Sequence, residues 1–536
     1  MQGLVVCPEP LAAKAGSDAL TRGGTAVEAA IACAFAQGVV NPLLCGIGGT
    51  ALLLHYDAGT RLPAVVNGEV AIGSMIPGEW PALTLGRTET VGRYAIRGDR
   101  NQMGYNAVMV PGFVAACWEA WNSGPRNLPW SALLAPAEKL AGDGFAIDPY
   151  IARYWDEGVG SDAAPTGDGY PDLKTKLSTS ADARDIYLNN GARYRTGDFL
   201  RQTEYARSLA RLGSAGGADF YLGEVSKLIS QDMEDNGGAL TAQDLATYRA
   251  LPQDPFHFRH GRYELIVPPA PSMGPQLAAM LNTLLELGFE RENPDDPFVI
   301  DALARIMRSV LAGTRYMKAT PIESSAEATQ AAANPAWARE LAERIAGGDR
   351  MSTESNGFQS GTTHVTVVDA TGNIASMTHS IGSVGGAGLA TPQLGFLYNN
   401  FLGHFNPVPG HRDSILPGRR LGSGCPLIVL EDGIPVLAAG APGGSRIVTS
   451  LFQVLALVLL WKLPLEQALA KPRFHSEERQ MVLVERALSS AAVGALERLG
   501  NEVRVSDYTA RVQAIDLRGG RATPGADPRG GSSSRG

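Results

Sequence analysis

The strongest constraint on the fold is an abrupt change of pattern at residue 361. Residues 362–369 alternate along a run of β-branched side chains, residues 370–373 have the composition of a turn, and residues 374–379 alternate again. Two short alternating runs joined by a tight turn are typical of a β-hairpin. Because residues 320–361 are polar and rich in Ala, Glu and Ser, we expect a flexible, protease-sensitive boundary before the hairpin.

The N-terminal region predicts helix, turn and strand in that order. Thr25 and Glu28 have the spacing of a capping box, which opens an Ala-rich helix at Val27–Val40. Residues 51–55 follow as a strand. Further predicted helices are 130–141, 297–312, 447–460 and 490–499, further strands are 427–430 and 436–439, a surface loop covers 157–172, and a frayed tail covers 524–536.

Composition narrows the functional class. The chain has 536 residues, 44% hydrophobic side chains and a net charge of −8, so we expect a folded protein that binds no nucleic acid. The longest apolar run, Val454–Trp461, is far shorter than the ~20 residues of a membrane span, so no membrane association is expected. Five scattered cysteines predict buried reduced thiols, and the N-terminus shows no signal-peptide pattern. A cytoplasmic location is therefore expected.

Several common site chemistries have no motif here. The eight histidines include no H-E-x-x-H pattern, and the sequence has no G-x-S-x-G nucleophile elbow. The glycine turn at 46–49 is followed by no Lys-Ser or Lys-Thr pair, which argues against a phosphate loop. We therefore expect no bound metal and no cofactor.

A set of short motifs recurs in a fixed order along nearly the whole chain. They are residues 9–14 (EPLAAK), 23–27 (GGTAV), 41–42 (NP), 46–49 (GIGG), 111–112 (PG), 134–136 (LAP), 240–245 (LTAQDL), 271–274 (PSMG), 361–364 (GTTH), 399–400 (NN) and 441–446 (APGGSR). In this order the chain resembles the γ-glutamyltransferase (glutathione hydrolase) family of N-terminal nucleophile hydrolases.

The resemblance implies an α+β fold, a four-layer αββα sandwich made as one inactive precursor. The precursor would cleave itself between Gly361 and Thr362. Residues 1–361 would form a large, mostly helical subunit with some sheet strands, and residues 362–536 a small catalytic subunit. The two would stay together as a heterodimer, with further oligomerisation possible.

The resemblance assigns Thr362 as the nucleophile. Its hydroxyl would attack the Gly361 carbonyl during maturation, and glycine offers no side chain to obstruct that attack. Once freed, an α-amine has an ordinary pKa of about 7.7–8.0, suitable for the hydroxyl's general base. Taken alone, Thr362 is better explained as an ordinary strand threonine.

Three further positions match the family's machinery. Gly443 and Gly444 correspond to its oxyanion-hole glycines, whose bare N–H groups can approach a tetrahedral oxyanion. The same glycines also suit a tight turn before a helix. Ser380 stands where the family has a supporting threonine hydroxyl, and Thr363 and His364 are expected behind the nucleophile.

The substrate-binding positions depart from glutamyl-specific members. Gly68 replaces the arginine that binds the substrate α-carboxylate, and Phe401 and His404 replace the Gln and Asp that hold the α-amino group. Gly422-Ser423 replaces a serine pair and Gly382 an asparagine. An arginine binds the carboxylate of a zwitterionic glutamyl group, and an acidic side chain binds its ammonium. Because both are replaced, we expect specific recognition of the glutamyl group to be lost. Arg93, Arg97 and Arg100 are candidate cations for a substrate carboxylate, although solvated surface arginines explain them better.

We therefore expect an autoprocessing amide hydrolase or acylase, acting on a small-molecule amide with water or an acceptor amine. The substrate is expected to differ from a γ-glutamyl zwitterion, as in the cephalosporin-acylase-like and oxamate-amidohydrolase-like branches. Two alternatives stay open: a true glutathione hydrolase or γ-glutamyl transpeptidase, and a catalytically idle relative that binds a small ligand.

Overall fold

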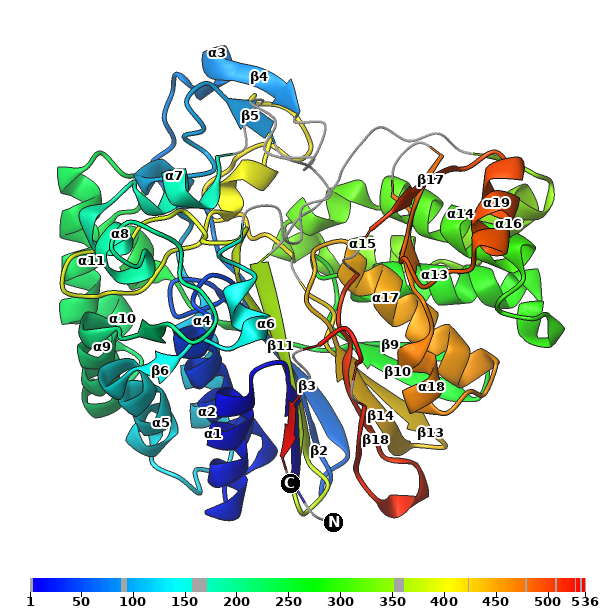
Figure 1. Cartoon of the computed structure of the whole chain (residues 1–536), viewed down its shortest axis with the longest axis horizontal. Helices are drawn as coiled ribbons and strands as arrows, with labels where there is room; N and C mark the ends of the chain where they lie inside the picture. The colour runs from blue at the N-terminus through cyan, green and yellow to red at the C-terminus, as the bar shows by residue number, and fades with distance from the viewer. Residues whose placement is uncertain are drawn as a thin grey trace.

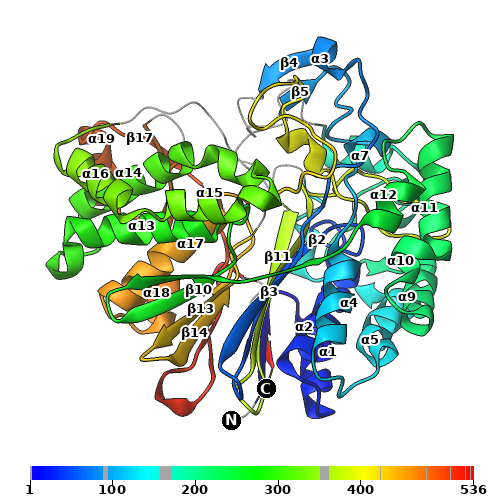
Figure 2. The ribbon, with the colours of Figure 1, turned by 180° about the vertical axis from the view of Figure 1, so that it is seen from behind.

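Two β-sheets packed face to face form the centre of the molecule, and helices cover the outer face of each (Figure 1). The computed structural model describes residues 3–87, 94–156, 171–350, 361–422, 424–477, 480–506, 509–525, 527–530 and 533–535. The view from behind shows the same four layers of helix, sheet, sheet and helix (Figure 2). The predicted αββα sandwich is confirmed.

The first sheet has seven strands in the order β20-β1-β11-β12-β2-β3-β8, and its paired strands are all antiparallel. Their bounds are β1 Leu4–Cys7, β2 Thr50–Asp57, β3 Leu62–Gly68, β8 Leu251–Gln253, β11 Gly361–Val368, β12 Ile374–Gly382 and β20 Ser533–Arg535. The predicted hairpin is β11 and β12, and it lies between β1 and β2.

The second sheet has six strands in the order β19-β18-β14-β13-β10-β9. Their bounds are β9 Phe256–His260, β10 Tyr263–Val267, β13 Leu427–Glu431, β14 Ile434–Gly440, β18 Gln513–Asp516 and β19 Thr523–Gly525. Both sheets therefore contain strands from either side of residue 361, so residues 1–361 and 362–536 share one fold.

Helices form the outer layers. Those on the first sheet's side include α1 Pro10–Thr21, α2 Ala26–Val40, α4 Phe113–Ser123, α5 Trp130–Asp143, α9 Thr203–Ala215 and α11 Glu224–Asp235. Those on the second sheet's side include α13 Gly274–Leu287, α14 Pro297–Gly313, α15 Ser325–Ala332, α16 Pro335–Ala346, α17 Arg446–Leu455, α18 Leu465–Ala470 and α19 Ser490–Arg498. Helix α2 begins with the predicted capping box, in which both reciprocal hydrogen bonds form.

Strand alternation divides the apolar side chains of the first sheet between its two faces. On β2, Leu53 faces the helices around α2, whereas Leu52 and Leu54 face the second sheet. The core between the sheets also contains Val368 of β11 and Ile374 of β12. Because successive side chains on a strand point to opposite faces, Thr362, His364 and Thr366 of β11 also face the second sheet. The interface is thus apolar at one end and polar at the other.

The polar end is closely packed. Gly440, the last residue of β14, lies against the imidazole of His364, and a Cβ there would come within 2.1 Å of the ring. The ring is held in place, with Nδ1 2.8 Å from Thr378 Oγ1 and Nε2 3.0 Å from Thr366 Oγ1. The Ser376 hydroxyl donates to the Ala439 carbonyl at 3.1 Å. These contacts fix the end of β14 over the start of β11.

Most predicted elements are confirmed, and two predictions are wrong. Residues 325–346 form helices α15 and α16 and are not a flexible boundary. The tail is not frayed throughout, because β19 and β20 pair with β18 and β1. Residues 157–170 of the predicted loop and 351–360 of the predicted boundary lie outside the described residues.

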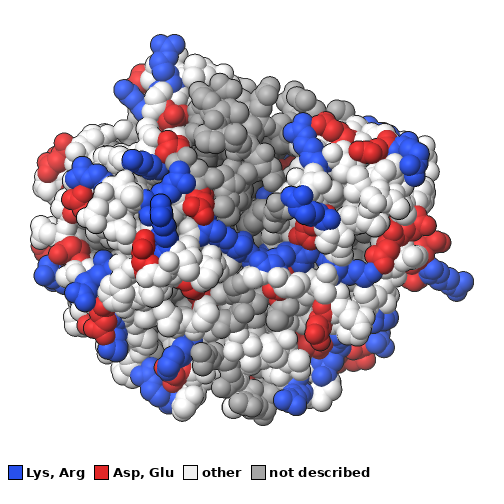
Figure 3. Space-filling model, in the orientation of Figure 1, with Lys and Arg blue, Asp and Glu red and all other residues white. Residues whose placement is uncertain are grey.

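The surface carries charges of both signs. On the face seen in Figure 3 acidic and basic side chains are interspersed, and a row of basic ones crosses its middle. All five cysteines are buried and free, as predicted. Within the described ranges no helix is long and apolar enough to cross a membrane.

The contact of Gly440 with His364 predicts a large effect of one added methyl group. Gly440→Ala is expected to lower the free energy of unfolding by about 1–3 kcal/mol, because the ring cannot move without breaking its hydrogen bonds. Urea unfolding measures this. Gly78→Ala is the control, since a Cβ there meets no atom within 4 Å. Equal stabilities of the two variants would contradict this account of the sheet contact.

Candidate functional site

Three groups at the start of β11 form a connected hydrogen-bonded set. Thr362 Oγ1 donates to Ser380 Oγ at 3.2 Å, and the Ser380 hydroxyl donates to the Gly361 carbonyl oxygen. Thr362 is 3% exposed and Ser380 is 1% exposed, so both hydroxyls lie in a nearly water-free environment. The predicted nucleophile and its predicted supporting hydroxyl are therefore in contact.

The peptide bond between Gly361 and Thr362 lies at a break in strand pairing. Gly361 pairs with Gly382 and Thr362 with Ser380, so the register shifts between them as in a β-bulge. The Gly382 N–H donates to Ser380 Oγ at 3.0 Å, which fixes that hydroxyl. The bulge turns the Gly361 carbonyl toward the Ser380 hydroxyl.

A buried polar network lies behind the nucleophile, on the face of β11 that contacts α2. Glu9 accepts hydrogen bonds from Gln37 at 2.6 Å, Asn41 at 2.7 Å and the Thr363 hydroxyl at 3.0 Å. His379 Nε2 lies 2.9 Å from the Gln37 amide oxygen. Burial raises the pKa of Glu9, and its hydrogen bonds act in the opposite direction. The sequence analysis noted Glu9 only within a motif, because no local pattern shows that it contacts Thr363.

The two histidines near Thr362 are neutral at physiological pH. Burial lowers the pKa of His364 to about 3, with a smaller contribution from His379, and burial alone lowers the pKa of His379 to about 3. Both nitrogens of the neutral His364 ring lie within hydrogen-bond distance of threonine hydroxyls, so this ring positions its neighbours. An imidazole with so low a pKa is a poor general base, and His364 lies two residues along β11 from Thr362.

The candidate oxyanion loop follows β14 directly. Gly443 and Gly444 have φ angles of 126° and 63°, in the region that favours glycine, and helix α17 begins two residues after Gly444. Since β14 ends against His364 and Thr362 is two residues before His364, the loop and the nucleophile lie at the same end of the sheet interface. The N–H groups of a helix N-terminus are directed outward there.

Close packing surrounds Gly68, which stands where glutamyl-specific relatives are expected to have a carboxylate-binding arginine. A Cβ on Gly68 would lie 2.5 Å from Ala116 Cβ and 2.5 Å from the Gly112 carbonyl oxygen. The nearby Arg420 donates to the carbonyl oxygens of Asn67 at 3.2 Å and Arg249 at 2.5 Å. Its guanidinium therefore holds the backbone at this position.

Two positions expected to lie near a substrate ammonium in glutamyl-specific relatives are Phe401 and Gly382. The first is apolar here, and the space beside the second is filled. Phe401 belongs to a buried apolar cluster with Met109 and Leu421, and its ring centroid lies 5.9 Å from that of His404. A Cβ on Gly382 would meet the Asn400 side-chain oxygen at 2.3 Å. The Asn400 amide thus occupies the space of the side chain that is missing at 382.

The remaining predicted substrate-binding positions do not form one cluster among the described residues. The Gly422 N–H donates to the Lys318 carbonyl at 2.8 Å, whereas Ser423 lies outside the described residues. Arg97 and Arg100 are exposed, and Arg100 pairs with Glu79 at 3.3 Å. Arg93 also lies outside the described residues.

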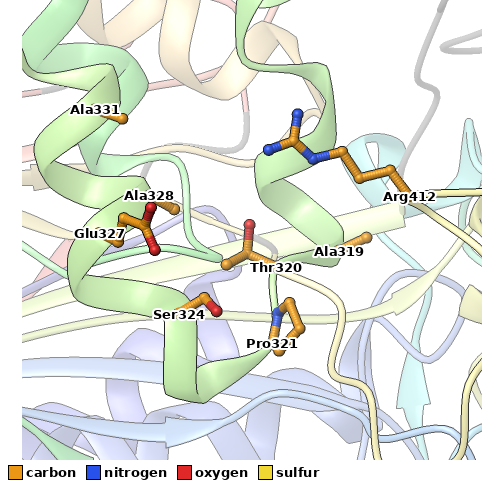
Figure 4. Close-up of a pocket in the computed structure, with 8 residues that line it drawn as sticks. All are labelled: Ala319, Thr320, Pro321, Ser324, Glu327, Ala328, Ala331 and Arg412. Atoms are coloured by element: carbon orange, nitrogen blue, oxygen red, sulfur yellow. The ribbon is translucent and has the colours of Figure 1, made fainter.

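Two cavities flank the 3₁₀ turn η3, Arg315–Ala319, and the segment after it. One, of about 230 Å³, has the side chains of Thr320, Glu327 and Arg412 around it (Figure 4). The other, of about 50 Å³, is lined by residues that include Gly422 and Ser445, and Ser445 directly follows the candidate oxyanion glycines Gly443 and Gly444. Sequence reasoning missed the second cavity, because its walls come from distant segments.

Comparisons with known proteins agree with this geometry. A family model described as Gamma-glutamyltranspeptidase matches residues 12–536. The Glutathione hydrolase proenzyme of Bacillus subtilis (strain 168) is 28% identical over 542 residues, 96% of this chain and 88% of the relative. The Acylase ACY 1 proenzyme of Pseudomonas sp. (strain SE83) is 31% identical over 513 residues, 94% of this chain and 87% of the relative.

A solved structure agrees as well. The crystal structure of cephalosporin acylase from Bacillus halodurans has a TM-score of 0.85 and 26% identity, covering 100% of this chain and 95% of that one. The protein is an N-terminal nucleophile hydrolase in fold and class. It belongs to the γ-glutamyltranspeptidase family, whose enzymes act on amides and consist of a large and a small subunit.

The conformation of the oxyanion loop gives a test of its role. Gly444→Val is expected to lower turnover by about 10²–10³, because a β-branched residue at φ 63° would displace the backbone donors. Steady-state amidase assays of the processed enzyme measure this. Gly433→Val is the control, since that glycine has φ 78° in the β13–β14 turn, with nothing within 4 Å. Unchanged turnover in the Gly444 variant would exclude the loop from the site.

Proposed function

We propose that the protein is an autoprocessing amide hydrolase whose nucleophile is Thr362 and whose substrate differs from a γ-glutamyl zwitterion. The observation that supports this most is the hydroxyl pair Thr362–Ser380 at 3.2 Å, with Ser380 directed at the Gly361 carbonyl. The two relatives named proenzymes are consistent with maturation by cleavage.

This geometry supports a maturation step by self-cleavage. Thr362 Oγ1 attacks the Gly361 carbonyl carbon, and the Ser380 hydroxyl stabilises the negative charge that develops on the carbonyl oxygen. The hydroxyl proton passes to the departing nitrogen as the C–N bond breaks, which leaves an ester to Oγ1 and a free α-amine, and water then hydrolyses the ester. The products are residues 1–361 and 362–536. Because both sheets contain strands from each product, the two remain associated as a heterodimer.

Catalysis then uses the same hydroxyl. The new α-amine of Thr362 takes the hydroxyl proton as Oγ1 attacks the substrate amide, and it later passes a proton to the leaving amine. The N–H groups of Gly443 and Gly444 bind the oxyanion of the tetrahedral intermediate. Water, or an acceptor amine, releases the acyl group from Thr362. This chemistry requires no metal and no cofactor.

The proposed maturation can be tested at its nucleophile. Thr362→Ala is expected to remain a single uncleaved chain without amidase activity, because no hydroxyl remains to attack Gly361. Thr362→Ser should be processed, more slowly. Denaturing gels and N-terminal sequencing of the small fragment measure both. Thr371→Ala, in the turn of the same hairpin, should mature normally, and efficient cleavage of Thr362→Ala at Gly361 would refute the assignment.

The second prediction concerns specificity. Glutaryl-p-nitroanilide is expected to have a kcat/KM at least about 100-fold above that of γ-glutamyl-p-nitroanilide. The ammonium of the second compound meets Phe401 and Gly382 in place of an acid, and an unpaired charge in a partly dry site costs about 3 kcal/mol or more. Steady-state kinetics on the pair decides this, with acetyl-p-nitroanilide as the small neutral control. A higher value for the glutamyl compound would identify a glutathione hydrolase with a rearranged pocket.

A further inference from the structure

A fully buried lysine lies against the loop next to Gly361. Lys176 belongs to the short helix α7, Leu173–Leu177, and is 1% exposed. Lysine is almost never buried to this degree, because an ammonium taken out of water loses more free energy than neutral hydrogen bonds return. The reason for its burial must therefore lie in the groups that the ammonium contacts.

The Lys176 ammonium contacts the loop that follows strand β12. It donates to the Ser383 hydroxyl oxygen at 2.6 Å and to the Val384 carbonyl at 2.7 Å. The same Ser383 oxygen accepts from the Asn400 amide nitrogen at 2.7 Å, and the Ser383 N–H donates to the Asn400 side-chain oxygen at 3.0 Å. The loop is thus held from two sides, by one residue before position 361 and by one after it.

This loop packs directly against Gly361. A Cβ on Gly361 would lie 3.1 Å from the carbonyl carbon and oxygen of Ser383. Gly382, the residue before Ser383, pairs with Gly361 at the bulge, and its N–H donates to Ser380 Oγ at 3.0 Å. The Ser380 hydroxyl in turn donates to the Gly361 carbonyl. A short path of backbone and hydrogen bonds therefore leads from the lysine ammonium to the scissile carbonyl.

Backbone packing fixes helix α7 against the same loop. A Cβ on Gly388 would lie 2.0 Å from the Lys176 carbonyl oxygen, and one on Gly385 would lie 2.6 Å from Leu173 Cδ1. The Gly385 N–H also donates to the Leu43 carbonyl at 2.8 Å, which ties the loop to the segment after α2. The ammonium is therefore attached to a support that has little room to shift relative to the loop.

We propose that Lys176 is a positioning residue for self-cleavage, which holds the loop after β12 so that Ser380 and the Gly361 carbonyl keep their bulged arrangement. The ammonium acts through the Ser383 hydroxyl and the Val384 carbonyl, and not as an acid or a base. Because attack on a carbonyl is sensitive to displacements of about 1 Å, a loosened loop slows this step strongly. The inference rests on the self-cleavage proposed above, and adds to it a residue outside the family motifs.

The test measures the rate of self-cleavage in variants of the two partners. Pulse-labelled wild type, Lys176→Met, Lys176→Arg and Ser383→Ala are followed on denaturing gels as the full chain is converted to residues 1–361 and 362–536. Lys176→Met keeps an unbranched side chain without a donor, and is expected to slow cleavage by about 10- to 100-fold. Ser383→Ala removes the oxygen that the ammonium binds, and should slow cleavage by about tenfold.

The order of the two Lys176 variants separates positioning from simple packing. Methionine fits the space of a lysine more closely than arginine does, so a packing role predicts that Lys176→Met matures faster than Lys176→Arg. Arginine keeps a cation with several donors, so a positioning role predicts the reverse, with Lys176→Arg at least about fivefold faster. The double variant Lys176→Met, Ser383→Ala should match the slower single variant within about twofold, because both changes remove the same contact.

Ser180→Ala is the matched control for a loss of stability. The Ser180 hydroxyl accepts from the Ala183 N–H at 3.1 Å and from the Ala390 N–H at 3.2 Å. It therefore joins the same two parts of the chain as Lys176 does, at a different point of the later segment. Ser180→Ala should mature within about twofold of the wild-type rate, although it loses a helix cap. Urea unfolding of each variant in an uncleaved Thr362→Ala background measures its stability.

The outcomes are distinct. Slow cleavage of Lys176→Met and Ser383→Ala, recovery in Lys176→Arg and normal cleavage of Ser180→Ala support the proposal. Lys176→Met at the wild-type rate, Lys176→Met faster than Lys176→Arg, or rates that follow the urea stabilities overturn it, while the proposed function stands. If Lys176→Met does not fold, Ser383→Ala decides, and its cleavage at the wild-type rate overturns the proposal. If wild type is not cleaved at Gly361, the proposed function falls and this inference falls with it.

Discussion

The contact between the two sheets is the constraint on which the site depends. At one end it is filled by aliphatic side chains such as Leu52 and Ile428, which anchor the sheets together. At the other end the same faces carry hydroxyls and one imidazole, and Gly440 allows β14 to approach His364 closely. This approach sets the distance from β14, and hence from the loop after it, to the start of β11. A nucleophile and its oxyanion donors can thus come from different sheets and still have a fixed geometry.

Interleaved strands explain how one chain can be cut without falling apart. The hairpin β11–β12 lies between β1 and β2, and β13 pairs with β10 from the other side of residue 361. Strands from both sides of residue 361 must therefore be in place before the Gly361–Thr362 bond reaches its bulged, Ser380-bonded conformation. Under the proposed maturation, the ladders on both sides of the cut would remain and would keep the new N-terminus where it formed.

The sequence predicts local elements and motif residues well and long-range contacts poorly. The hairpin, the capped helix α2 and helices α5 and α14 were expected, because alternation and capping are local signals. Strand β20 was not, since a Gly/Ser/Arg-rich segment acquires its strand from its partner β1. The contact of Ser380 with Thr362 was expected from family motifs, whereas that of Glu9 with Thr363 depends on tertiary packing.

Tertiary packing also explains why glycine stands at both 68 and 382. Gly68 has no room for an arginine, because Ala116 and the Gly112 carbonyl fill that space. Gly382 has no room for an asparagine, because Asn400 occupies it. Placing an arginine at 68 and an asparagine at 382 would therefore require helix α4 and the segment around Asn400 to move. The backbone and side chains packed around these two glycines therefore leave no space for a larger side chain at either position.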